Sequence, residues 1–392
     1  MDTQHPSVPG NEDVLDRRFL LGGLTGLAGI AALSAVTRNA AAGPIDPPAG
    51  PVVPTGRTLA EVEPRIPIGP VTTPGDADAV FKITQPGSYY LTGNITGAVG
   101  KHGIEIAASD VTVDLCGFAL IGMAASLDGV TCRTNGLANV AVVNGTVRGW
   151  GGSGVDLTTN TVSSSRAERV RAMSNGVDGL RVSGVIVACE AAGNAAAGFQ
   201  AAQGSLVVDC LSRNNGDGGY AMSSNSAASR CVAYSNGGVG IGGGSSVSVV
   251  DCSSTANNAE GVVVVNASVV SRCTVRNNTG PGIAGGNGNL ITGCAANGNG
   301  GGTGGTGAGI RVTSTDNRVE GNLCASNGVG IEVVGAGCFI TRNTCTSNGT
   351  NWSVASGNVF LAVQAAITGA AVNGAAGGVA PGSTDPNANF SF

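Results

Sequence analysis

One cysteine recurs every 21 residues through the middle of the chain, and this period constrains the fold more than any other feature. Six cysteines keep the spacing without a break: Cys189, Cys210, Cys231, Cys252, Cys273 and Cys294. An asparagine follows each one five residues later, at Asn194, Asn215, Asn236, Asn257, Asn278 and Asn299. In the first five units a glycine then precedes an apolar residue, as in Gly240-Ile241. A repeat of this regularity predicts a stack of equivalent structural units.

The length of the unit limits what it can be. A stretch of 21 residues is too short for two packed helices, but it fits one coil of a parallel β-solenoid with two or three short strands. Residues one period apart would then be in-register neighbours, about 4.8 Å apart. We expect the asparagines to form a ladder of side-chain amides, and the glycine to serve a turn with positive φ.

The period continues after one interruption. The interval from Cys294 to Cys324 is 30 residues, so we expect nine inserted residues, in the glycine-rich stretch Gly300 to Ala308. The interval from Cys324 to Cys345 returns to 21 residues. This interpretation places eight cysteines in one column of the solenoid.

Sequences upstream of the regular repeat carry a resemblance to a known family. The stretches "ITQPGSYYLTGNITG" and "HGIEIAASDVTVDLCGFALIG" resemble the first coils of right-handed parallel β-helix repeat proteins, the pectin-lyase-like superfamily. The resemblance covers roughly Phe81 to Asn358. It implies an all-β fold, a right-handed single-stranded parallel β-helix with about 21 residues per coil, and it says little about activity.

The ends of the chain differ in composition from the repeat. Arg17-Arg18 precede an apolar run to Val36, and small residues follow near Ala42, an arrangement that resembles a twin-arginine export signal. A retained membrane anchor is the competing interpretation, because the run is about 18 residues long. We expect an export signal over 1–42, a proline-rich linker over 43–75, the β-helix over 76–358 and a C-terminal cap over 359–392.

These features predict where the protein works and what it meets. We expect it in the periplasm, at the cell surface or secreted from a bacterium, as a monomer, in contact with a membrane only through an uncleaved signal. Only 11% of the residues are charged and the formal net charge is -5, which argues against nucleic acid as a partner. Histidine occurs only at His5 and His102, which makes a Ser/His catalytic triad a poor hypothesis.

The repeated cysteine admits three interpretations. Stacked cysteines would lie about 4.8 Å apart, beyond the usual Cβ separation of a disulfide, and a row of ligands does not converge on one metal ion. A buried ladder of small apolar side chains therefore fits best. Some disulfides remain the alternative for an exported chain, and a metal site is the least favoured. The redox state of Cys116, Cys132 and Cys338, which lie off the column, stays open.

Charged residues next to the cysteines form a second pattern. If the cysteine points inward, the residues one before it, one after it and three after it should point outward. The position before it reads Asp209, Arg230, Asp251 and Arg272, and the position three after it includes Arg213, Tyr234 and Arg276. Arg311 and Glu332, on the strand with the apolar residue, are also one period apart and of opposite sign.

Two functions are compatible with this pattern. The first is a non-catalytic scaffold that binds polysaccharide at most, in which alternating charges fix the register of the coils. The second comes from the resemblance, since glycans lie across outward strand faces in similar lyases and hydrolases. It implies a polysaccharide lyase, epimerase or hydrolase and adds the following candidates. The catalytic candidates are Arg213, Arg230, Tyr234, Arg272 and Arg276, and the substrate-binding candidates are Asp209 and Asp251.

No cofactor is expected. Calcium is the one to consider, because carboxylates are its usual ligands. Two coils separate Asp209 from Asp251 by about 9.6 Å, with Arg230 between them, and this spacing opposes a shared calcium ion. The enzyme hypothesis further predicts a walled groove over the strand that carries the cysteines.

Overall fold

The computed structural model describes residues 62–158, 162–365, 372–374 and 386–392. The expected export signal, 1–42, lies outside the described residues. The described part consists of short parallel strands and one 3-10 helix, η1 (Gly302–Gly304). No helix in it is long and apolar enough to cross a membrane.

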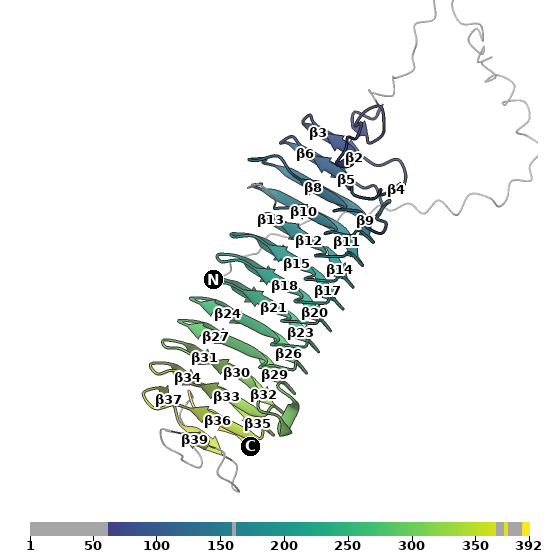
Figure 1. Ribbon diagram of the computed structural model, residues 1–392. Coiled ribbons are helices and arrows are strands. Elements are labelled where there is room, and N and C mark those ends of the chain that lie inside the picture. The colour runs from purple at the N-terminus through teal and green to yellow at the C-terminus, as the bar shows by residue number, and fades with distance from the viewer. Residues whose placement is uncertain (1–61, 159–161, 366–371, 375–385) are drawn as a thin grey trace, which may run out of the picture. The chain divides into compact units, whose positions relative to one another are not determined.

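Most coils contribute three strands, and the coils stack in parallel register (Figure 1). In one coil these are β18 (Tyr220–Met222), β19 (Ala227–Ser229) and β20 (Val232–Tyr234). Each pairs with the strand 21 residues later, and Tyr220 lies opposite Ile241. The sequence-based expectation of an all-β parallel solenoid is thus confirmed.

The first face is a 14-stranded parallel sheet, called here the wide sheet. Its strands are β2 (Ala79–Ile83), β5 (His102–Ile106), β8 (Val130–Cys132), β10 (Val155–Leu157), β12 (Leu180–Val182), β15 (Phe199–Ala201), β18, β21 (Ile241–Gly243), β24 (Val262–Asn266), β27 (Ile283–Asn287), β30 (Ala308–Val312), β33 (Val329–Val333), β36 (Thr350–Val354) and β39 (Val372–Gly374).

The second and third faces are joined, because β9 (Val140–Arg148) and β11 (Ser165–Met173) run around the corner between them. The second face also holds β1 (Ile66–Pro67), β3 (Gly87–Tyr90), β6 (Val111–Asp114), β13 (Gly184–Val187), β16 (Leu206–Val208), β19, β22 (Ser248–Val250), β25 (Val269–Ser271), β28 (Leu290–Thr292), β31 (Arg318–Glu320), β34 (Phe339–Thr341) and β37 (Val359–Phe360). The third face holds β4 (Ile95–Thr96), β7 (Ala119–Ile121), β14 (Glu190–Ala192), β17 (Leu211–Arg213), β20, β23 (Ser253–Thr255), β26 (Thr274–Arg276), β29 (Ala295–Asn297), β32 (Leu323–Ala325), β35 (Thr344–Thr346), β38 (Val363–Ala365) and β40 (Asn389–Ser391).

The repeated cysteine lies at a corner between two strands, and not within a strand. Cys210 falls between β16 and β17, and the residue before it, Asp209, has a left-handed φ of 55°. The same conformation recurs one coil later at Arg230, where φ is 52°. This bend turns the chain from the second face to the third, so these cysteines directly precede the strands of the third face.

The asparagines form the predicted ladder at the next corner. Asn215 donates from Nδ2 to Oδ1 of Asn236 over 2.9 Å, and Asn236 does the same to Asn257 over 3.0 Å. Each is almost fully buried, at 1–2% exposure. Because every coil's amide is satisfied by the next coil, the ladder holds adjacent coils in register.

A third corner was not predicted from the sequence. Its column contains Ser205, Ser226, Val247, Ser268, Asn289, Asn317, Cys338 and Asn358. The polar members accept a backbone N–H from the coil before, as Asn289 does from Ser268 over 2.9 Å. Several side chains can perform this task, so no single letter marks the column. Cys338 belongs to this third corner column.

The insertion is shorter than expected. Ala296 pairs with Cys324, 28 positions later, so seven residues are inserted where nine were predicted. The column of Cys294 continues instead with Asn322, which accepts the N–H of Cys294 over 2.9 Å. The eight-cysteine column is therefore wrong. Six cysteines share one corner, while Cys324 and Cys345 stack on each other inside β32 and β35.

All eleven cysteines are free thiols. The six corner cysteines are at most 3% exposed, so the prediction that they fill core space is confirmed. Cys132 and Cys338 are also buried, whereas Cys116 is exposed.

Strand pairing extends beyond both expected limits of the β-helix. Within the stretch expected as a linker, β1 pairs in parallel with β3. Within the stretch expected as a cap, β37 pairs with β34, and β40 pairs with β35.

Candidate functional site

The alternating charges at the cysteine corner form bidentate pairs. Arg230 contacts both oxygens of Asp209, at 2.6 and 2.9 Å, and Arg272 contacts Asp251 in the same way, at 2.7 and 2.9 Å. We call these four residues the corner charge ladder. The hydrogen bonds from the arginines lower the pKa of both carboxyls, which therefore stay ionised and paired.

The other sequence candidates lie on the third face. Arg213 is in register with Tyr234, and Arg276 stands two coils further along. Arg213 donates to Glu190 over 2.8 Å, and Tyr234 is about half exposed. A hollow of about 310 Å³ lies beside Arg276. The structure brings Arg213 and Tyr234 together, but it sets the corner charge ladder apart from them at the bend.

A more continuous feature runs along the outside of the wide sheet. One outward residue per coil stacks into an outer column: Lys82, Glu105, Thr131, Asp156, Arg181, Gln200, Ala221, Gly242, Val263, Ala284, Arg311, Glu332 and Ser353. Its two ends carry charged side chains, and its centre carries small ones.

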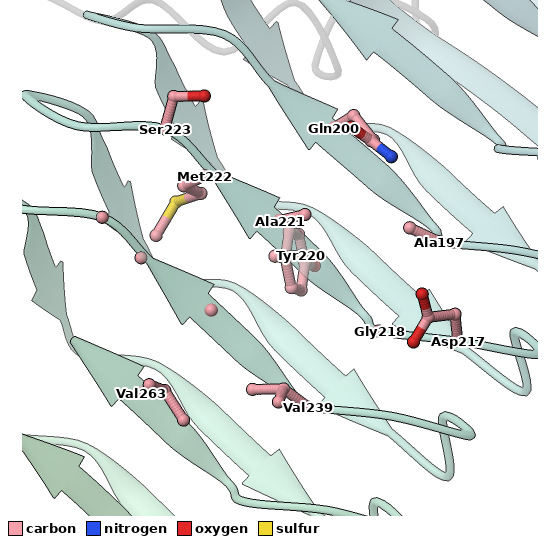
Figure 2. A pocket seen from close by; sticks show the side chains of 13 residues that line it. Ala197, Gln200, Asp217, Gly218, Tyr220, Ala221, Met222, Ser223, Val239 and Val263 are labelled. Carbon is pink, nitrogen blue, oxygen red and sulfur yellow. The ribbon is translucent and has the colours of Figure 1, made fainter. Parts of the chain in front are cut away.

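The small central residues leave a trough on this face. It has a volume of about 480 Å³ and spans the column from Gln200 to Val263, three coil spacings or about 14 Å. Figure 2 shows Gln200 on β15 and Ala221 on the next strand, β18, while Val263 lies two strands further along, on β24. Asp217 lies just before β18. The polar side chains that line it are Gln200, Asp217 and Ser223.

Glycine is what opens the trough at its centre. A methyl group on Gly242 would meet only the carbonyl oxygen of Tyr220, at 3.5 Å, and a methyl of Val239, at 3.8 Å. Both are ordinary van der Waals distances, so the outward side of this residue has room. Two residues earlier, a methyl group on Gly240 would lie 2.0 Å from Oγ of Ser254, inside the core.

Charged groups gather at the end of the trough next to Gln200. Arg181 lies between two carboxylates, with Nη1 3.6 Å from Asp156 and Nε 3.8 Å from Asp178. Asp178 is 2% exposed and accepts the N–H of Ala197 over 2.9 Å. Burial raises the pKa of Asp178 in spite of these partners. This cluster, Asp156, Asp178 and Arg181, is called the trough head.

Charged side chains toward both ends of the outer column form ion pairs with their neighbours in the column. Lys82 contacts Glu105 over 3.1 Å, and Arg311 contacts Glu332 over 3.0 Å. The second pair is one that the sequence placed on neighbouring coils with opposite sign.

No group of three or more histidine, cysteine, aspartate or glutamate side chains that could hold a metal ion is found among the described residues. The carboxylates of the trough head are held around an arginine, and the corner thiols stand in a row.

The sequence carried a signal for the outer column that the sequence analysis did not use. In each regular unit the residue after the glycine-apolar pair points outward on the wide sheet, as Gly242 does after Gly240-Ile241. Listing that position down the repeat gives the outer column directly. The cysteine corner is conspicuous in the sequence because one residue type repeats there, whereas the trough is marked by small residues of several types.

Comparison with known proteins identifies the fold. A family model described as a right-handed β-helix region matches residues 128–284. The chain is a right-handed parallel β-helix. A sequence search of the curated proteins finds no match.

Three solved structures illustrate the similarity. The A-module of the Azotobacter vinelandii mannuronan C-5 epimerase AlgE6 is 15% identical, with 78% of this chain and 91% of that chain covered and a TM-score of 0.52. The A-module of AlgE4 from the same organism is 12% identical, with 68% and 90% covered and a TM-score of 0.46. Pectate lyase Pel9A is 16% identical, with 70% and 73% covered and a TM-score of 0.32. At such identities the likeness concerns the fold alone.

Proposed function

We propose that this protein is an exported, non-catalytic β-helix that binds an uncharged polysaccharide along the trough of the wide sheet. The observation that carries the proposal is the trough itself, where four successive coils present Gln200, Ala221, Gly242 and Val263 around about 480 Å³ of open space. This volume is within the range of small-ligand sites, roughly 300–1,000 Å³.

The shape of the trough suits an extended chain molecule. It runs across strands, along the direction in which the coils repeat about every 4.8 Å, so each coil can offer equivalent contacts to successive sugars. Gln200, Asp217 and Ser223 provide hydrogen-bond acceptors and donors for hydroxyl groups at its edges. The apolar floor of Ala221 and Val263 provides a surface for sugar C–H groups.

The charges around the trough favour an uncharged chain over a polyuronate. Asp217 lines it, and the trough head adds two carboxyls against one guanidinium. A polyuronate would bring a further carboxylate with every sugar into this acidic surrounding, where like charges repel. One protein of similar fold is named as an epimerase of mannuronan, so polysaccharide is a reasonable ligand class to test first.

A hydrolase is the second candidate, and Asp178 is the observation that favours it. A carboxyl with a raised pKa beside a polysaccharide site is the type of group that acts as a general acid. Against this, Asp178 is 2% exposed and its Oδ1 is engaged by the N–H of Ala197.

Export remains a prediction from the arginine pair and apolar run within residues 1–42.

Affinity electrophoresis on a panel of polysaccharides tests the proposal. Native gels would contain one polymer each, including β-glucans, mannans and xylans as uncharged chains and alginate and pectate as polyuronates. We expect retardation by at least one uncharged polymer and none by the polyuronates, with no release of reducing ends or unsaturated products. Mobility unchanged by every uncharged polymer would contradict binding. Product release that disappears in Asp178→Asn would favour the hydrolase.

A further inference from the structure

The six corner cysteines share one geometry. Each thiol donates to the backbone carbonyl two residues before it, over 3.1 to 3.4 Å. On either side of the corner, the flanking residues of neighbouring coils are in register, as Val208 is with Ser229 and Leu211 with Val232. We call this row the thiol column: Cys189, Cys210, Cys231, Cys252, Cys273 and Cys294.

The regular geometry fixes the spacing of the sulfur atoms. Side chains with the same conformation on adjacent coils repeat with the coil spacing, about 4.8 Å. A thiolate sulfur binds a d10 metal ion at about 2.3 Å, so two sulfurs in line with one ion span about 4.6 Å. A two-coordinate ion therefore fits between neighbouring sulfurs of the column with almost no movement of the backbone.

We propose that the thiol column binds soft monovalent d10 cations, copper(I) in particular, each held in line between the sulfurs of two adjacent coils. Soft thiolates select copper(I) over harder ions. Sulfur atoms in a row cannot surround a tetrahedral ion, but they are placed as a two-coordinate, linear ion requires. Six thiols taken in neighbouring pairs hold three ions. The column ends where Asn322 takes the corner position after Cys294.

Binding of each ion changes the charge of the column by a defined amount. Two S–H groups lose their protons, one monovalent ion enters, and each bridge carries a net charge of minus one. Arg230 and Arg272, one residue before Cys231 and Cys273, lie within electrostatic reach of these sulfurs and offset part of that charge. Because each ion displaces two thiol protons, metal competes with protons and binding strengthens as pH rises.

Two variants with the same number of thiols separate bridging from ordinary thiol affinity. Cys210→Ser, Cys252→Ser and Cys294→Ser together leave three thiols with no neighbour in the column. Cys252→Ser, Cys273→Ser and Cys294→Ser together leave three adjacent thiols. The remaining cysteines, including the stacked Cys324 and Cys345, are the same in both.

The experiment is an anaerobic titration of the reduced full-length proteins with copper(I), in the presence of a competing chelator, with silver(I) as a second probe. We expect the adjacent variant to hold one more ion than the separated variant, with at least tenfold higher affinity and two protons released for that ion. X-ray absorption of the loaded wild type should show two sulfur neighbours per copper. Equal stoichiometry and affinity in the two variants, or three or more sulfurs per copper, would overturn the proposal. The wild-type spectrum decides the question by itself if a variant fails to fold.

Discussion

The corner charge ladder and the trough arise from the same repeat, but the ladder's side chains pair with one another whereas the trough is left open. At the corner, an acidic and a basic residue alternate from coil to coil, and each carboxylate of the ladder is bound by an arginine at 2.6 to 2.9 Å. On the wide sheet, the outer column changes from charged residues to Ala221 and Gly242, and a volume of about 480 Å³ is left open.

This difference separates structural from functional surface in a β-solenoid. A column that is occupied in every coil satisfies its own side chains, because the neighbour one coil away is always within reach. A column that carries only small residues over a few coils exposes the backbone and leaves space in which another molecule can bind. The residues that repeat most clearly are for that reason poor guides to a binding site.

The largest effect on stability is expected at Gly240, which directly precedes β21, the strand at the centre of the trough. Gly240→Ala would place a methyl group 2.6 Å from the carbonyl oxygen of Gly261, which the backbone cannot move away from. We expect a loss of about 2–4 kcal/mol in the free energy of unfolding. Chemical denaturation measures it, and Gly242→Ala is the matched control, expected within about 0.5 kcal/mol of wild type. Equal stability of the two variants would contradict the packing described here.

Filling the trough should abolish binding without harming the fold. Gly242→Tyr places a large side chain on the outward surface at the centre of the trough, where the structure has room for it. We expect affinity for the bound polysaccharide to fall at least tenfold, about 1.4 kcal/mol, while the midpoint of thermal unfolding stays close to wild type. Retained affinity in a folded Gly242→Tyr protein would move the site away from the wide sheet.

A smaller, pH-dependent effect is expected at the trough head. Burial raises the pKa of Asp178 above its ordinary value of 3.8, so the folded protein binds more protons than the unfolded chain as this carboxyl titrates. Stability contributed by this group is therefore complete at low pH and is lost as pH rises through the folded pKa. Asp178→Asn keeps an oxygen for the N–H of Ala197 and should unfold at a higher temperature than wild type near neutral pH.

Thermal unfolding between about pH 3 and about pH 7 checks this sign. The advantage of Asp178→Asn should shrink as pH falls and disappear where Asp178 is protonated in both states. A variant less stable than wild type near neutral pH would show that the ionised carboxylate stabilises the fold through Arg181.

The smallest effect is expected at the corner charge ladder. Hydrogen bonds from Arg230 lower the pKa of Asp209, so their contribution to stability is present above the unfolded value of 3.8 and is lost as pH falls through the folded pKa. Both side chains are exposed, and solvent screens the pair. Arg230→Ala should lower the unfolding temperature slightly in low salt, with no difference in high salt and unchanged polysaccharide binding. Reduced binding in this variant would favour a glycan site at the corner.

The solenoid could be predicted because one period governs most of the chain. Cysteine and asparagine each mark a corner with a single letter, and the 21-residue spacing follows from them. The third corner escaped prediction because serine, valine, asparagine and cysteine all occupy it. The length of the insertion was misjudged for the same reason, since Asn322 replaces cysteine at the corner and Cys324 belongs to a strand.

The candidate site was harder to predict than the fold. The charges of Arg230 and Asp209 are visible in the sequence, and their adjacency follows from the period. The trough depends on Ala221 and Gly242 having almost no side chain, and small residues are common throughout this glycine-rich chain. Only the coil geometry shows that these two lie side by side on an outward surface, next to Gln200 and the buried Asp178.

A crystal structure with an oligosaccharide from the polymer that retards the protein most tests the central claim directly. We predict electron density for sugars across the wide sheet, over Ala221 and Gly242, with hydroxyl contacts to Gln200 or Asp217. Density over Arg213, Tyr234 and Arg276 on the third face, or along the corner charge ladder, would contradict the claim.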